Sequence, residues 1–387
     1  MQAGRQSPSN CPTPSATGCS SEQAARGFDP SNGKCQGTGI VPLTSPPLPL
    51  DEVGLVEPLG QMIGGHVTPI DHGYIFGIHG HQGSTPNEYE VLAPADGLIV
   101  AMTATARSGN EAFVDHAVTF SITCTLSVHY LNMDTFDDHI VRQSGEVTPE
   151  RSWDGAIPVK AGEVIGHTGP HGIDIFVWNA DLTLTGFVRP DQYTAGEEWK
   201  THTADPYEYF AEPIRSQLLA KNPRVASPRG GKIDYDVDGR LIGSWFKEGS
   251  GGYTGGAQGG EGYWKGHLAI VPDAYDPSGT MVSIGDWAGD ARQFGIRGVY
   301  ANPADVLTAT GVVKYELSQP NWVVASTGAR WDNDSYKGPV RFQPTESVQG
   351  VLLVQMVEDR RLEVEMFPGK NASEVAGFDS NAVYYER

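Results

Sequence analysis

The sequence predicts a mainly β protein of two domains joined by a connection with one short helix. The chain has 387 residues, more than one typical domain needs. It contains 48 glycines and 27 prolines, and short apolar runs bounded by Gly, Pro, Asn and Asp recur along it. Long stretches with helical periodicity are scarce, so strands and tight turns are expected to dominate.

Composition divides the chain into four regions. They are a Ser/Pro/Gly-rich arm (1–47), a first β domain (48–190), a helix-containing connection (191–229) and a second β domain (230–387). The arm has few apolar residues and is expected to be loose apart from its cysteines. The second domain is expected to be a sandwich or a barrel, because its apolar runs alternate and turn signals separate them.

The strands of the first domain are expected at GYIFGIH, EYEVLAPADGLIVAM, AVTFSITCTLSVHYLNM, IPVKAGEVIGHT and IDIFVWN. A helix is expected within 205–222, where Ile214, Leu218 and Leu219 recur at helical spacing. Strands of the second domain are expected at KIDYDV, RLIGSWF, HLAIV, TMVSIG, VVKYEL, GVLLVQMV and LEVEMF. Asp238-Gly239 predicts a hairpin turn between the first two of these.

Cysteine content and charge restrict the setting. The four cysteines are Cys11, Cys19, Cys35 and Cys124, and an even number in such a context favours two disulfides in an oxidising compartment, with four free thiols as the alternative. The first ten residues have no apolar core and do not resemble a signal peptide. Because the cysteines favour an oxidising compartment, we expect a secreted or cell-surface protein. No run of eighteen apolar residues predicts a membrane span. The net charge of -20 disfavours nucleic acid as a partner.

Three stretches of the first domain resemble lysostaphin-type zinc endopeptidases, in the order that the family has them. Residues 89–102 resemble the family's hairpin "pVyAPadGvVv", and 159–166 resemble its "VkkGqvIG" turn. His66 and Asp71 lie where the family has H-x-x-x-D. The resemblance covers about residues 60–180. It implies an antiparallel β groove that holds one zinc ion and hydrolyses peptide bonds of bacterial cell-wall crosslinks.

The implied zinc site needs three protein ligands and an open position for water. The resemblance implies His66, Asp71 or the adjacent His72, and Asp174 as ligands; zinc is expected, with manganese or iron as alternatives. In one register Gly172 and Asp174 replace the family's H-x-H pair. In the other, His171 is the first histidine and Asp174 is one residue out of step.

The catalytic set departs from the family pattern. Asn132 stands where the family's Y-x-H-L motif has a catalytic histidine, and an amide can donate to an oxyanion but is a poor base. His129 lies three residues earlier, which predicts the opposite strand face and no simple replacement. His171 and Asn132 are therefore the candidate catalytic residues, and ten of the 11 histidines lie between 66 and 202.

A calcium loop is a weaker alternative in the second domain. Asp234, Asp236 and Asp238 have the spacing that begins such a loop, but its twelfth position is Trp245, where a bidentate glutamate is expected. The alternation of Ile233, Tyr235 and Val237 favours a hairpin instead.

Three function classes stay open on the sequence. The first, which we favour, is an exported, degenerate lysostaphin-like protein, with or without a metal, that serves as an extracellular binding or regulatory module for a peptide or cell-wall ligand. The second is an active metallohydrolase with a rewired site. The third is a structural surface protein. The sequence leaves the oligomeric state open.

Overall fold

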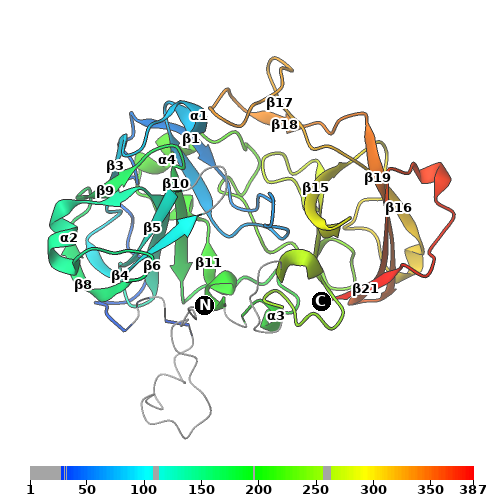
Figure 1. Ribbon diagram of the computed structural model, residues 1–387, viewed down its shortest axis with the longest axis horizontal. Helices are drawn as coiled ribbons and strands as arrows, with labels where there is room; N and C mark the ends of the chain where they lie inside the picture. The colour runs from blue at the N-terminus through cyan, green and yellow to red at the C-terminus, as the bar shows by residue number, and fades with distance from the viewer. Residues whose placement is uncertain (1–27, 30, 32, 108–112, 195–196, 256–262) are drawn as a thin grey trace, which may run out of the picture.

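The computed structural model describes residues 28–387, apart from 30, 32, 108–112, 195–196 and 256–262. Two β-rich lobes lie side by side, the first formed by the N-terminal half of the chain and the second by the C-terminal half (Figure 1). The prediction of a mainly β protein with two domains is confirmed. In the described part of the chain, no helix is long and apolar enough to cross a membrane.

An antiparallel sheet forms the first lobe. Its strands follow the order β1-β2-β10-β6-β5-β4-β8, and β11 also pairs with β10. The bounds are β1 (Val53–Glu57), β2 (Gly73–Gly77), β10 (Ile173–Asn179), β6 (Leu126–Met133), β5 (Phe113–Ser121), β4 (Gly97–Arg107), β8 (Trp153–Val159) and β11 (Thr203–Ala204). A second, smaller sheet has the order β3-β9-β7, with β3 (Tyr89–Leu92), β9 (Val164–Thr168) and β7 (Thr135–Phe136). All five predicted strand regions therefore contain strands.

Strand alternation gives the large sheet one apolar face. Ile173, Ile175 and Val177 of β10 lie in the main hydrophobic core. The intervening Asp174 and Phe176 point to the opposite face, because successive side chains of a strand alternate. This face carries the candidate site.

The second lobe is a closed barrel of β12-β13-β14-β15-β16-β19-β20-β21, which decides between the two expected architectures. Its strands are β12 (Gly243–Lys247), β13 (His267–Pro272), β14 (Thr280–Trp287), β15 (Asp290–Ile296), β16 (Val313–Ser318), β19 (Val348–Glu358), β20 (Arg361–Pro368) and β21 (Val383–Glu386); β17 (Trp322–Val324) and β18 (Val340–Phe342) pair separately. The predicted strand KIDYDV is wrong, since residues 232–237 have no regular structure. Asp238-Gly239 therefore forms a turn without a hairpin.

The helices are short. They are α1 (Gly80–Gly83), α2 (Asp138–Ser144), α3 (Asp191–Thr194) and α4 (Ile214–Leu219), with 3-10 turns η1 (Glu198–His202), η2 (Pro206–Tyr209), η3 (Tyr263–Gly266), η4 (Thr308–Thr310) and η5 (Ala372–Glu374). The helix predicted within 205–222 is divided into η2 and α4, with Pro213 preceding α4. Beyond the predicted domain boundary at 190, β11 pairs with β10 of the first sheet.

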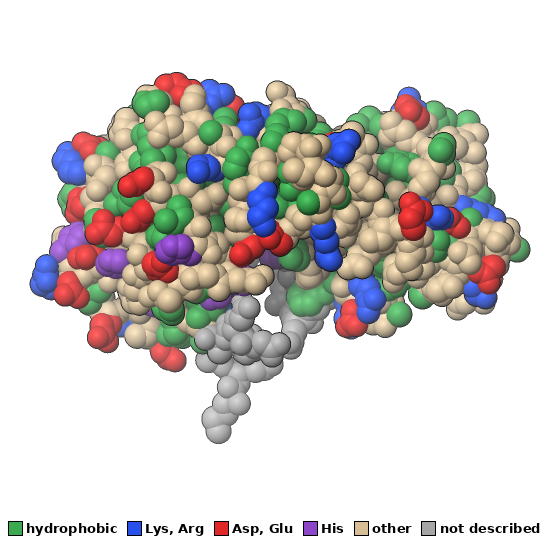
Figure 2. Space-filling view, turned by 90° about the horizontal axis from the view of Figure 1, so that it is seen from above, with side chains coloured by type: hydrophobic (Ala, Val, Ile, Leu, Met, Phe, Trp, Pro, Cys, Tyr) green, Lys and Arg blue, Asp and Glu red, His purple; other side chains and the backbone are tan. Residues whose placement is uncertain are grey.

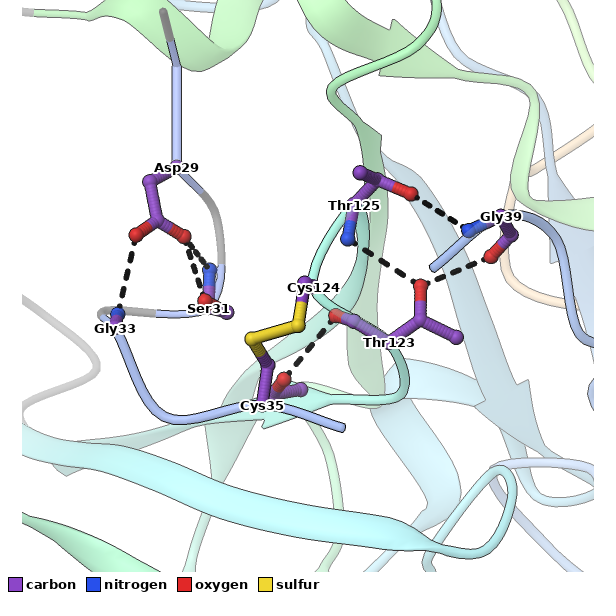
Figure 3. The surroundings of a disulfide bond; sticks show 9 residues. Asp29, Ser31, Gly33, Cys35, Gly39, Thr123, Cys124 and Thr125 are labelled. Atoms are coloured by element: carbon purple, nitrogen blue, oxygen red, sulfur yellow. Dashed lines mark hydrogen bonds between the residues drawn. A yellow bond between two sulfur atoms is a disulfide. The ribbon is translucent and has the colours of Figure 1, made fainter. Parts of the chain in front are cut away.

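A disulfide and local hydrogen bonds attach the described part of the N-terminal arm to the first domain (Figure 3). Cys35 is bonded to Cys124, and Thr123 and Thr125 hydrogen bond to Gly39. Leu43 is fully buried. The arm is therefore anchored from Cys35 onwards. Cys11 and Cys19, the other predicted disulfide partners, lie outside the described residues.

The two lobes share buried side chains. One apolar cluster combines residues of both lobes, including Leu59, Tyr193 and Phe246. Glu57 of β1 accepts a 2.7 Å hydrogen bond from the hydroxyl of Tyr275, which precedes β14 in the barrel. Both groups are buried, so the hydrogen bond fixes the first sheet against the barrel.

Candidate functional site

Polar side chains on and beside three neighbouring strands of the large sheet form a group of buried and half-buried residues. His72 directly precedes β2, Tyr74 lies on β2, Asp174 on β10 and Asn132 on β6. Asp71 and Lys200 complete the group, which we call the polar centre. The sheet brings these residues together because β10 pairs with β2 on one side and with β6 on the other.

His72 lies between two carboxylates. Its Nδ1 is 3.3 Å from Asp71 Oδ1, and its Nε2 is 3.3 Å from Asp174 Oδ2. The Tyr74 hydroxyl is 3.1 Å from the same Nε2. The His72 ring also packs on Phe176, with 4.4 Å between ring centroids. Both ring nitrogens therefore have polar partners, and the ring orientation is fixed.

Asn132 occupies the position at which the resemblance expects a catalytic histidine, and it is engaged with Asp174. Its Nδ2 donates a 2.7 Å hydrogen bond to Asp174 Oδ1. Its backbone N–H donates to Asp115 Oδ1 over 2.8 Å, and its carbonyl accepts from the Thr168 hydroxyl over 3.0 Å. Three hydrogen bonds thus fix this residue.

A local change of backbone conformation points Asn132 to this face of the sheet. Tyr130 and Met133 both lie in the core, so strict alternation is broken between them. The φ angle of Asn132 is +66°, a left-handed conformation that asparagine adopts more readily than most residues. The prediction that His129 lies on the face opposite to Asn132 is therefore wrong. His129 packs against Phe176, with 5.5 Å between ring centroids.

Trp199 and Lys200 of η1 cover Asp71. The Trp199 indole Nε1 donates to Asp71 Oδ2 over 3.2 Å, and Lys200 Nζ lies 3.6 Å from the same oxygen. The Lys200 side chain is only 3% exposed. Its ammonium also lies 4.5 Å from the ring centroid of Tyr253, which belongs to the second lobe. The polar centre is thus closed by residues of the connection and of the barrel.

The two carboxyl groups of the polar centre have different acidities. Burial alone would raise the pKa of Asp71, but the Lys200 ammonium and the hydrogen bond with His72 outweigh it and hold that pKa well below its usual range. Burial raises the pKa of Asp174 to about 6, although His72 and Asn132 favour its charged form. Burial also lowers the pKa of the nearby His129 to about 4. The two carboxyl groups are therefore shifted in opposite directions, with the pKa of Asp71 lowered and that of Asp174 raised.

The predicted metal ligands are only partly brought together. His72 Nε2 and Asp174 Oδ2 are close enough to share one ion. Asp71 faces Nδ1, on another side of the imidazole ring, so it cannot bind the same ion as Nε2. His66 is exposed, and its ring centroid lies 6.2 Å from that of His72.

The described side chains therefore do not fit a three-ligand zinc site as they are placed. Among them, no group of three or more His, Cys, Asp and Glu residues is arranged to hold a metal ion. Zinc, manganese or iron at this centre stays a prediction.

His171, the other candidate catalytic residue, lines a surface pocket. Its ring stacks on Phe113, with 3.7 Å between centroids and 12° between planes. Asp174 shares its strand face with Phe176 and Trp178. The φ angle of Gly172 is +63°, in the turn that leads into β10.

The three aspartates of the calcium-loop alternative have separate partners. Asp234 binds Lys232, Asp236 accepts from the backbone of Ser244, and Asp238 forms two hydrogen bonds with Arg360. Each carboxylate is thus engaged in its own interaction.

Sequence reasoning missed Lys200, Trp199 and Tyr74. Lys200 and Trp199 lie in a polar stretch with no motif, more than a hundred residues from Asp71. The sequence predicts Tyr74 only as a residue of the strand that follows His72. The alternation around His72 could have placed Tyr74 on the same face, but no local signal predicts the approach of Lys200.

No family model matches the chain, and no curated protein or solved structure is significantly similar to it.

Proposed function

We propose that this protein is an extracellular binding or regulatory module whose lysostaphin-like domain does not hydrolyse its ligand. The observation that carries the proposal is the hydrogen bond from Asn132 to Asp174. A general base must take up a proton, and an amide at this position cannot do so near neutral pH. The disulfide between Cys35 and Cys124 is consistent with an oxidising, extracellular setting.

The closure of the polar centre supports the same proposal. A hydrolase needs a reacting bond within hydrogen-bond distance of its catalytic groups. Here the side chains of His72 and Lys200 are 8% and 3% exposed. Trp199 and Tyr253 pack over this region from other parts of the chain. The centre contributes to the stability of the domain, and ligand binding is left to its open surface.

Peptide hydrolysis and ligand retention test this function together. The full chain is incubated with glycine-rich peptides and bacterial cell-wall fragments, with zinc or manganese added. We expect no cleavage above that of Asp174→Asn, together with retention on immobilised wall fragments that a chelator does not abolish. Cleavage that disappears in Asp174→Asn would overturn the proposal.

A rewired metallohydrolase is the second candidate, because His72 Nε2 and Asp174 Oδ2 are separated by 3.3 Å, as two ligands of one ion are. Mass spectrometry of metal content decides this. About one transition metal per chain, lost in Asp174→Asn and in His66→Ala, would favour this candidate. Matched control variants, such as Asp359→Asn in the barrel, should keep the metal content of the wild type.

A further inference from the structure

An open pocket lies on the first lobe beside His171. Its volume is about 660 Å³, within the range of small-ligand sites. We call it the His171 pocket. Its lining residues come from α1 and the loop after it, the start of β5 and two turns: His81, Gln82, Ser84, Pro86, Asn87, Phe113, Val114, Asp134, Pro170 and His171. On the face seen in Figure 2, histidine side chains lie on this lobe.

Aromatic rings form one wall of the His171 pocket. Phe113 and His171 are stacked, and the centroid of the His81 ring is 5.9 Å from that of His171. His81 Nδ1 is 2.8 Å from the carbonyl oxygen of Pro170, which fixes its ring relative to the turn. The pocket therefore offers rigid π faces, which attract cations and also apolar groups.

Asp134 places a carboxylate in the His171 pocket. One carboxylate oxygen, Oδ2, accepts a 2.7 Å hydrogen bond from the backbone of Asn87. That contact fixes the side chain and leaves Oδ1 to a ligand. Among the described lining residues, Asp134 is the only carboxylate, and none is Lys or Arg. The protein's net charge of -20 adds a long-range attraction for cations.

We propose that the His171 pocket binds a basic group of a peptide ligand, either a Lys or Arg side chain or a free amino terminus. The cation lies against the Phe113 ring and pairs with Asp134. This inference rests on the proposed binding function and names the chemical class of its ligand. Nucleic acid and anionic lipid are repelled by the same charges.

Calorimetric titration of the full chain tests the proposal. The probes are the peptide Gly-Lys-Gly, with blocked ends, and the same peptide acetylated on the lysine. We expect the charged peptide to bind about tenfold more tightly, since acetylation removes the charge. Asp134→Asn and Phe113→Leu should each weaken the charged peptide about tenfold. Asp359→Asn removes one exposed carboxylate from the barrel and should leave binding unchanged.

Other outcomes overturn the inference. Equal binding of the two peptides, binding of Asp134→Asn as in wild type, or binding only of an uncharged cell-wall saccharide would each contradict a basic ligand. Cleavage of the bound peptide would overturn the proposed non-hydrolytic function but leave this inference intact. If neither peptide is bound or cleaved, the inference of a basic ligand is wrong, whereas the proposed non-hydrolytic function is not contradicted. Thermal melting of each variant confirms that a loss of affinity is not a loss of folding.

Discussion

Asn132 and Asp174 join β6 to β10 by a 2.7 Å hydrogen bond from the amide Nδ2 to the carboxylate Oδ1. The contact exists because Asn132 has a φ of +66°, which brings its side chain to the face that carries Asp174. Asn132 thus has a left-handed backbone conformation within a strand and stands at the position where the resemblance expects a catalytic histidine.

Substitution of Asn132 should separate its side-chain contact from its backbone conformation. Asn132→Gly keeps the left-handed conformation but loses the hydrogen bond to a buried carboxylate, which should cost about 1–3 kcal/mol of unfolding free energy. Asn132→Ala should cost about 1 kcal/mol more, because alanine is disfavoured at positive φ. Urea unfolding measures both. An alanine variant as stable as the glycine variant would show that backbone conformation is unimportant here.

Removal of the buried ammonium should destabilise the fold. Lys200→Met leaves Asp71 as a buried carboxylate without its cation, which should cost about 3–5 kcal/mol. Asp71→Asn alone leaves the ammonium unpaired and should also be costly. The double variant should be more stable than the sum of the single losses predicts, because the two charges compensate each other. Strict additivity in denaturant unfolding would contradict this pairing.

Stability should fall with rising pH through Glu57. Burial raises the pKa of Glu57 from 4.5 to about 7, against the hydrogen bonds from Gln61 and Tyr275. Between these values the folded state holds a proton that the unfolded state releases, so the unfolding free energy decreases as pH rises and levels off above pH 7. This group contributes on the order of 3 kcal/mol to the decrease.

Glu57→Gln checks that assignment. The unfolding free energy of the variant should depend less steeply on pH between 4.5 and 7 than that of wild type, because the titrating group is gone. Glu90→Gln, at an exposed carboxylate, serves as the control and should keep the slope of wild type. Parallel curves for wild type and Glu57→Gln would assign the pH dependence to other groups.

The disulfide should be a major source of stability. Cys35 and Cys124 are 89 residues apart, and closing a loop of that length restricts the unfolded chain by about 4–5 kcal/mol. The double variant Cys35→Ser/Cys124→Ser should therefore unfold at much lower denaturant concentration. A reductant should reproduce this loss in wild type and have no such effect in the double variant. An unchanged midpoint after complete reduction would contradict the expectation.

The sequence by itself determined the class of fold and the positions of the strands. Residues 173–179 alternate between side chains of the main core and side chains on the face that carries the polar centre, and that period of two is a local property of the chain. The resemblance to lysostaphin-type enzymes, not alternation, suggested His72, Asp174 and Asn132 as members of one site. Alternation failed at KIDYDV, where Ile233 and Tyr235 suggested a strand. Residues 232–237 have no regular structure there, although Ile233 packs into the cluster between the lobes.

Only the tertiary structure decided how the polar centre is closed and which residues remain open. The pairing of Lys200 with Asp71 and the stacking of Phe113 on His171 join residues that are distant in sequence. The orientation of Asn132 depends on a single φ angle, which alternation cannot predict. These contacts arise from the packing of whole elements, because the burial of a charge depends on every segment that covers it. Local sequence patterns do not show which distant segments will cover a residue. The sequence therefore suggested which residues belong to the site but not how exposed their side chains are to solvent.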